Sequence, residues 1–178
     1  MSEIEITKLI FGIFLSVFGI VLIFLAFLLF YKYLVQEKRC ISKVKGIIKR
    51  YSFVSYGGLR LPIVYYMVDD KEYKVKGPEY KWIITKTKST PTSKNKVDYK
   101  VKGQSLIINC EVNAFISVYK NPLYDKYPLN SEIDVFYDPN NPKLAYVLRY
   151  CDKKFCFWLM LISGIVILII DILILICL

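Results

Sequence analysis

The sequence predicts an α+β membrane protein in which two transmembrane helices flank a small antiparallel β-sandwich or partly open barrel. Three observations support this fold class. The 178 residues carry an apolar run near each end, short β-branched and aromatic segments lie between turn residues in the middle, and the charge is concentrated between the runs. Of the 25 lysines and arginines, 24 lie between residues 32 and 154. The absence of histidine excludes the usual triad base and the commonest metal ligand.

The first apolar run extends from Leu9 to Tyr31 and carries no charge. As a helix it covers about 34 Å, which is enough to cross a hydrocarbon core of about 30 Å. A cleaved signal peptide is the alternative, but the leader MSEIEITK is acidic and the run is longer than a signal-peptide core. We therefore expect a short N-terminal tail at residues 1–8 and a retained transmembrane helix at residues 9–34.

The second apolar run extends from Phe155 to Leu178 and is interrupted by one acid, Asp171. A charged flank precedes it, and Phe157 and Trp158 follow that flank, as aromatic residues do at the headgroup level. This pattern predicts a second transmembrane helix at residues 155–178. The chain is then a two-pass membrane protein with a β-rich soluble domain at residues 35–150.

Positive charge flanks the central domain on both sides, whereas only Lys8 lies beyond the spans. The positive-inside rule predicts a cytosolic β-domain with both termini outside, although inserts longer than about 60 residues can cross a membrane despite their charge. The same basic residues are expected to contact anionic lipid headgroups. That contact explains the charge without nucleic acid as a partner. The juxtamembrane basic residues are Lys32, Lys38, Arg39, Lys43, Lys45, Arg149, Lys153 and Lys154.

The central domain has the alternation and turn signals of short antiparallel strands. Gly46 suggests a bulge or bend in the first strand, Asp69 and Asp70 predict a hairpin turn, and the polar segment Thr85–Asn95 predicts a mobile loop. The expected strands are Ser42–Val54, Leu61–Val68, Glu72–Lys76, Trp82–Thr85, Leu106–Val112, Glu132–Tyr137 and Leu144–Leu148.

The last strand pair carries the most distinctive motif, Tyr-Asp-Pro-x-x-Pro at Tyr137–Pro142. We expect the Asp138 carboxylate to accept backbone amides of its own turn, while Pro139 and Pro142 fix φ and end the strand ladder. A catalytic role for Asp138 would require a partner base, and the sequence offers none.

With this motif, the hairpin Val64–Tyr73 and Gly46, the chain resembles an uncharacterised membrane family, domain of unknown function 3592. The resemblance implies a β-rich segment flanked by transmembrane helices, and it implies no activity. That family tends to have Gly before the strand where Asn130 stands here, and Asn tolerates the positive φ of such a turn. The insertion Thr85–Val112 departs from the family pattern.

Asp171 is the sharpest single candidate, because an ionisable residue within a span is a functional-site hypothesis. On the first helix, Gly12, Ser16 and Gly19 form one face of small residues, which predicts close helix packing. We expect the helices to pack antiparallel, with Ser16 donating a hydrogen bond to Asp171, protonated or ionised. Two alternatives stay open: Asp171 reaches the outer headgroups, or it meets its copy in a homo-oligomer.

The five cysteines form no Cys-x-x-Cys pair, so the sequence predicts reduced thiols and no metal or other cofactor. Acylation of Cys40, Cys151 or Cys156 near the bilayer is an open alternative. A Cys40–Cys151 bridge is another, should the domain lie outside.

These observations favour a non-enzymatic membrane protein that presents its β-domain for protein–protein interaction, with an unknown partner. The alternative is a membrane-embedded immunity or regulatory factor, in which Asp171 and the helix faces would matter more than the domain. A hydrolase or transferase using Lys and Ser would need a concave site with a desolvated lysine. No glycine-rich phosphate-binding loop is present in the sequence.

Overall fold

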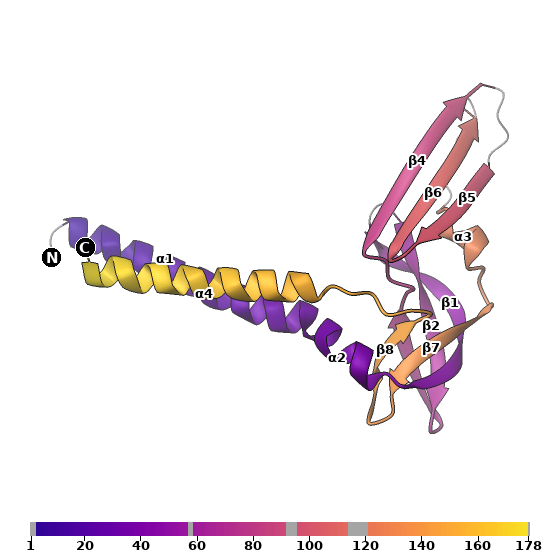
Figure 1. The fold of residues 1–178 in the computed structure, drawn as a ribbon, viewed down its shortest axis with the longest axis horizontal. Coiled ribbons are helices and arrows are strands. Elements are labelled where there is room, and N and C mark those ends of the chain that lie inside the picture. Colours follow the sequence, from indigo (N-terminus) through magenta and orange to yellow (C-terminus); the bar gives the residue numbers. More distant parts are fainter. Residues whose placement is uncertain (1–2, 57–58, 92–95, 114–120, 178) are drawn as a thin grey trace. The chain divides into compact units, whose positions relative to one another are not determined.

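The computed structural model describes residues 3–56, 59–91, 96–113 and 121–177. The chain divides into two compact units (Figure 1). The helical unit consists of Met1–Val35 with Lys153–Leu178, and the β unit consists of Gln36–Asp152.

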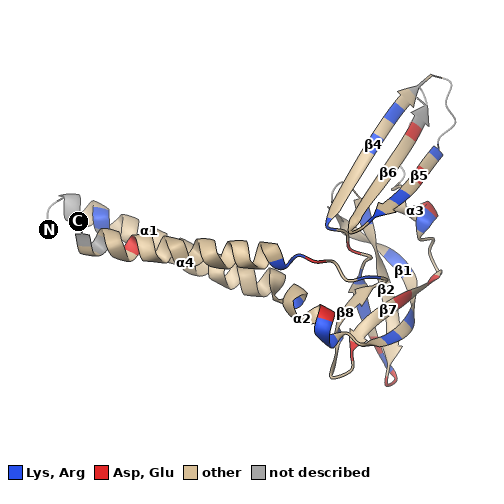
Figure 2. Ribbon diagram, in the orientation of Figure 1, with Lys and Arg blue, Asp and Glu red and all other residues tan. Residues whose placement is uncertain are grey.

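The helical unit contains the two apolar helices that the sequence predicts. The first begins as α1 (Glu3–Leu25), continues through a π-helical turn (Ala26–Phe30) and ends as α2 (Tyr31–Arg39), whose last residues belong to the β unit. The second is α4 (Lys154–Cys177), which packs against α1. Both helices are long and apolar enough to cross a membrane. Figure 2 shows that charged residues are rare along them.

The main sheet of the β unit has five strands in the order β3-β2-β1-β7-β8, and all neighbouring strands are antiparallel. Its edge strands β3 and β8 come together where a Cβ on Gly77 would lie 3.1 Å from Cβ of Val147, so the sheet is nearly closed. The strands are β1 (Ser42–Tyr56), β2 (Leu59–Val68), β3 (Lys71–Lys76), β7 (Glu132–Asp138) and β8 (Asn141–Val147).

The structure confirms the predicted β2–β3 hairpin and the predicted backbone of Asn130. Asp69 and Asp70 have φ of 48° and 58°, as a two-residue turn with positive φ at both positions requires, and Asn130 has φ of 62°. The predicted bulge does not lie at Gly46, because β1 pairs regularly with β7 there and its register against β2 shifts only after Ile48 and after Tyr51. Gly46 is needed for close packing instead, since its Cβ would lie 2.5 Å from Cγ1 of Val64 on β2.

The second sheet has three strands in the order β4-β6-β5. They are β4 (Trp82–Thr90), β5 (Lys96–Lys102) and β6 (Ser105–Asn113). β5 and β6 form an antiparallel hairpin around Gly103, whose φ is 56°. β4 pairs in parallel with β6, which departs from the predicted all-antiparallel fold. The most apolar strand, β6, takes the central position, and its Leu106 and Ile108 are fully buried.

The predicted loop Thr85–Asn95 is also corrected, because β4 continues to Thr90. Lysines and threonines alternate here, and a strand with a solvent-facing side accommodates this pattern. Residues 92–95 of that expected loop lie outside the described residues.

The buried side chains of both sheets belong to one hydrophobic cluster, and the segment between β6 and β7 joins the sheets. This segment includes α3 (Leu123–Lys126). The hydroxyl of Tyr51 on β1 donates to the carbonyl of Leu123 at 3.1 Å, and the hydroxyl of Tyr99 on β5 donates to the carbonyl of Pro122. Tyr51 and Tyr99 therefore attach the segment between β6 and β7 to both sheets.

Candidate functional site

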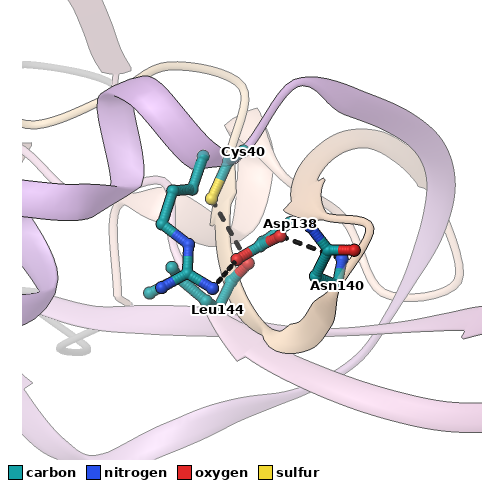
Figure 3. A network of polar contacts seen from close by, with 5 residues as sticks. Cys40, Asp138, Asn140 and Leu144 are labelled. Carbon is teal, nitrogen blue, oxygen red and sulfur yellow. Dashed lines mark hydrogen bonds and ion pairs between the residues drawn. The ribbon is translucent and has the colours of Figure 1, made fainter.

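The turn between β7 and β8 buries a carboxylate. Asp138 is only 1% exposed, and its Oδ1 accepts the backbone N–H of Asn140 at 2.9 Å. Its Oδ2 lies 2.7 Å from Nη2 of Arg39 at the end of α2 (Figure 3). The first contact is the one that the sequence predicts for this turn. The ion pair had no local sequence signal, because Arg39 lies far earlier in the chain.

Cys40 follows Arg39 and is buried beside the same turn. Its thiol donates a hydrogen bond to the carbonyl of Leu144, with Sγ and O 3.2 Å apart (Figure 3). Burial raises the pKa of the Cys40 thiol to about 11, with a further contribution from the negative charge of Asp138 that Arg39 partly offsets. At neutral pH the thiol is therefore protonated and a poor nucleophile. This environment disfavours acylation of Cys40.

A third side chain from the same helix end also binds the hairpin. The Gln36 side chain is buried, and its Nε2 donates to the carbonyl of Ala145 on β8 at 3.0 Å. Gln36, Arg39 and Cys40 stand at positions i, i+3 and i+4, so they share one face of the chain as it leaves the helix. We call the six residues Gln36, Arg39, Cys40, Asp138, Leu144 and Ala145 the stem junction.

Tyr66 on β2 binds the turn of the same hairpin. Its hydroxyl donates to the carbonyl of Pro142, the last residue of the Tyr137–Pro142 motif. Its ring lies 5.8 Å from that of Tyr73 and 6.3 Å from that of Tyr137. Burial raises the pKa of Tyr66 to about 12. The Tyr137–Pro142 motif thus anchors the β7–β8 turn to β2 and, through Asp138 and Arg39, to the end of α2. This role is structural.

Within the helical unit, the structure brings Ser16 and Asp171 together. The Ser16 hydroxyl donates a hydrogen bond to Oδ2 of Asp171. Asp171 is 2% exposed, and its Oδ1 is buried with no hydrogen-bond partner among the described residues. The polar pair is therefore enclosed between α1 and α4.

The helices approach closely at a pair of glycines. A Cβ on Gly19 would lie 2.9 Å from Leu168, and a Cβ on Gly164 would lie 2.7 Å from Ile23 and 2.9 Å from the carbonyl oxygen of Gly19. Gly12 is buried on the same helix as Gly19. The sequence pointed to the small-residue face of α1 but missed Gly164, whose signal was its spacing of seven residues from Asp171.

Several juxtamembrane basic residues of the β unit have partners within the protein. Lys43 and Lys45 lie 2.9 and 2.8 Å from the carboxylate of Asp134. Hydrogen bonds from these lysines lower the pKa of Asp134. Arg149 donates to the carbonyl of Gly103 at 3.0 Å, and its guanidinium lies over the ring of Tyr80.

The basic residues at the ends of the spans also contact aromatic groups. Lys153 donates to the hydroxyl of Tyr33 at 3.2 Å, and the Lys32 ammonium lies 4.6 Å from the centre of the same ring. Lys38 is exposed, and Lys154 begins α4. Much of the charge that the sequence assigned to headgroups thus has partners on the protein's own surface.

The structure groups no set of three His, Cys, Asp or Glu side chains as metal ligands within the residues that it describes. Cys40, Cys110, Cys151 and Cys156 form no disulfide within the described residues. Burial also raises the pKa of the Cys110 thiol. Cys40 and Cys110 therefore act as small buried side chains rather than as reactive groups.

Comparison with known proteins adds no relative: no family model, no curated protein and no solved structure matches the chain.

Proposed function

We propose that the chain is a two-pass integral membrane protein that presents a small β-domain at the cytosolic membrane surface for protein–protein interaction, with no enzymatic activity. One observation carries this proposal. Large apolar side chains are exposed along both long helices, among them Phe14 and Leu28 at 65% and Phe155 at 69%. Soluble monomers rarely expose apolar patches larger than a few hundred Å², whereas hydrocarbon solvates such surfaces. Membership of domain of unknown function 3592 stays a prediction.

Insertion and orientation are tested on membranes from cells that express the full chain. Alkaline carbonate should leave the protein in the membrane pellet, and release into the supernatant would contradict the two spans. Protease added outside sealed cells should spare the β-domain, while permeabilised cells should lose it. Digestion in sealed cells would place the domain outside.

The exposed end of β1 is the surface that best supports protein contact. Phe53 and Val54 are 86% and 70% exposed where the register between β1 and β2 shifts. A photo-reactive amino acid at position 53 should cross-link a defined protein in intact membranes, and a matched one at the exposed Lys74 on β3 should not. Equal cross-linking at both positions would contradict a specific contact.

The Ser16–Asp171 pair favours the second candidate, an immunity or regulatory factor that acts through the helices. The two functions predict opposite results for two substitutions. If the β-domain docks a protein, Phe53→Asp should remove the cellular effect and Asp171→Leu should keep it. If the chain acts through its helices, Asp171→Leu should remove the effect and Phe53→Asp should keep it.

A further inference from the structure

The three-stranded sheet carries a strongly basic outer face. Side chains alternate between the faces of a strand, and the buried Leu106 and Ile108 fix which face of β6 is inward. Across the register, Lys86 and Lys88 stand opposite Asn109 and Glu111, on the outward side. We call this outward side of the sheet the lysine face. It includes Trp82, Ile84, Lys86, Lys88, Lys96, Asp98, Lys100 and Lys102 of the two edge strands and Asn109 and Glu111 of β6.

The lysine face also exposes apolar surface. Trp82 is 63% exposed and Ile84 is 45% exposed. Asp98 and Glu111 are the acids on the described part of this face, and Asp98 lies 3.5 Å from the ammonium of Lys96. Lysines on edge strands also prevent pairing with other chains. That role does not explain an exposed tryptophan beside them.

The composition of this face matches an anionic lipid surface. Lysine is a hydrated point charge on a flexible stem, which suits mobile phosphates, whereas arginine provides the fixed bidentate geometry of specific recognition. The lysine face contains no arginine. Tryptophan favours the headgroup level, because one end of its ring system is apolar and the other donates a hydrogen bond.

The two apolar helices attach the β unit, and with it the lysine face, to a bilayer. Both ends of the β unit continue directly into the apolar helices, at Gln36 and at Asp152. In addition, Lys43, Lys45 and Arg39 are paired with carboxylates, which leaves less of the juxtamembrane charge for headgroups.

We propose that the lysine face binds anionic phospholipid headgroups. The inference rests on the proposed two-pass topology. Each lysine near an anionic membrane strengthens the contact about fivefold. Reversing two lysines should therefore weaken it well over tenfold, and high salt should weaken it as well.

The test uses the full chain reconstituted in lipid nanodiscs. Trp158→Phe leaves Trp82 as the single tryptophan of the two in the sequence. A trace lipid with a nitroxide on its headgroup quenches tryptophan fluorescence at short range. Quenching of Trp82 should be strong in phosphatidylglycerol discs, weak in phosphatidylcholine discs, and lost from phosphatidylglycerol discs in Lys86→Glu/Lys100→Glu.

The matched control is Lys71→Glu/Lys74→Glu, which makes the same change of charge at exposed positions of β3. It should keep the quenching, and a loss equal to that of Lys86→Glu/Lys100→Glu would overturn the assignment to this face. Equal quenching in both lipids would overturn the proposal. So would Trp82 emission that responds to a single-stranded oligonucleotide and not to lipid, since the face would then bind nucleic acid. A chain that fails to enter the discs would contradict the two-pass topology instead.

Discussion

At the scale of residues, the stem junction shows how a buried charge is stabilised. A buried carboxylate costs several kcal/mol unless it is paired and hydrogen-bonded. Asp138 meets both conditions through Arg39 and the N–H of Asn140. The Arg39 side chain is 48% exposed, so water solvates much of the guanidinium and little free energy is lost on its side of the pair.

Two replacements of Asp138 should distinguish the contributions of its two contacts to the free energy of unfolding. Asp138→Asn keeps an acceptor for the Asn140 amide but loses the charge, and should lower the free energy of unfolding by about 1 kcal/mol. Asp138→Ala loses both contacts and should cost about 3 kcal/mol. Thermal unfolding of the detergent-solubilised chain measures the difference. Asp134→Asn, at an ion pair whose lysines are more than half exposed, should cost less than either, and a larger loss there would contradict the role of burial.

The environment of Cys40 predicts a slow, strongly pH-dependent alkylation. Its pKa of about 11, against an ordinary 9.0, leaves about a hundredfold less thiolate at neutral pH. The rate should rise about tenfold per pH unit up to about pH 11, as long as the β unit stays folded. Mass spectrometry of the labelled peptides measures the rate of alkylation at Cys40.

A cysteine at Ile41, which is 75% exposed, gives the control in a Cys40→Ala chain. It should react fast near neutral pH. If Cys40 reacts equally fast, the thiol is not buried in the solution structure.

At the scale of elements, the Gly19–Gly164 approach sets the distance between α1 and α4, and the polar pair depends on that distance. Ser16 lies three residues before Gly19, and Asp171 lies seven after Gly164, so the glycines and the pair share one interface. Small residues let helix backbones approach in lipid, where packing drives association.

The elements differ in how far the sequence predicts them. The helices could be predicted because an uncharged run as long as Leu9–Tyr31 has few other solutions. The β2–β3 hairpin could be predicted because Asp69 and Asp70 tolerate positive φ. β5 was missed although its sequence carries the strand signal, because Val97, Tyr99 and Val101 alternate with charged residues. The Arg39–Asp138 pair could not be predicted, since it depends on which elements meet in the fold.

Gly164→Ile should force the helices apart, because even its Cβ meets Ile23 and the Gly19 backbone. In a chain with Ser16→Cys and Asp171→Cys, oxidation should form a disulfide in high yield. Adding Gly164→Ile should lower that yield severalfold, as measured on a non-reducing gel. Val166→Ile, at a position 46% exposed, should leave the yield unchanged. Equal yields in all three chains would contradict the glycine contact.

At the scale of the whole molecule, tyrosine hydroxyls join the parts of the β unit. The hydroxyls of Tyr80 and Tyr127 lie 2.7 Å apart, and Tyr99 and Tyr51 bond the same connection from different sheets. Burial raises the pKa of each of these groups, that of Tyr99 to about 12. The β unit therefore depends on its tyrosines staying protonated.

This dependence predicts alkaline unfolding of the β unit. In the unfolded chain tyrosine ionises near 10.0, whereas folded Tyr66 and Tyr99 hold their protons to about 12. Above pH 10 the unfolded state thus binds fewer protons, so stability is full below that pH and is lost as the pH rises through about 12. Near-UV circular dichroism should show the β unit unfolding over this range, while the far-UV helical signal persists, because α1 and α4 contain no tyrosine. Tyr66→Phe should lower the stability at neutral pH by about 1 kcal/mol, through its lost bond to Pro142, and should flatten the pH dependence. Tyrosines that all titrate near pH 10 in the folded protein would contradict their burial.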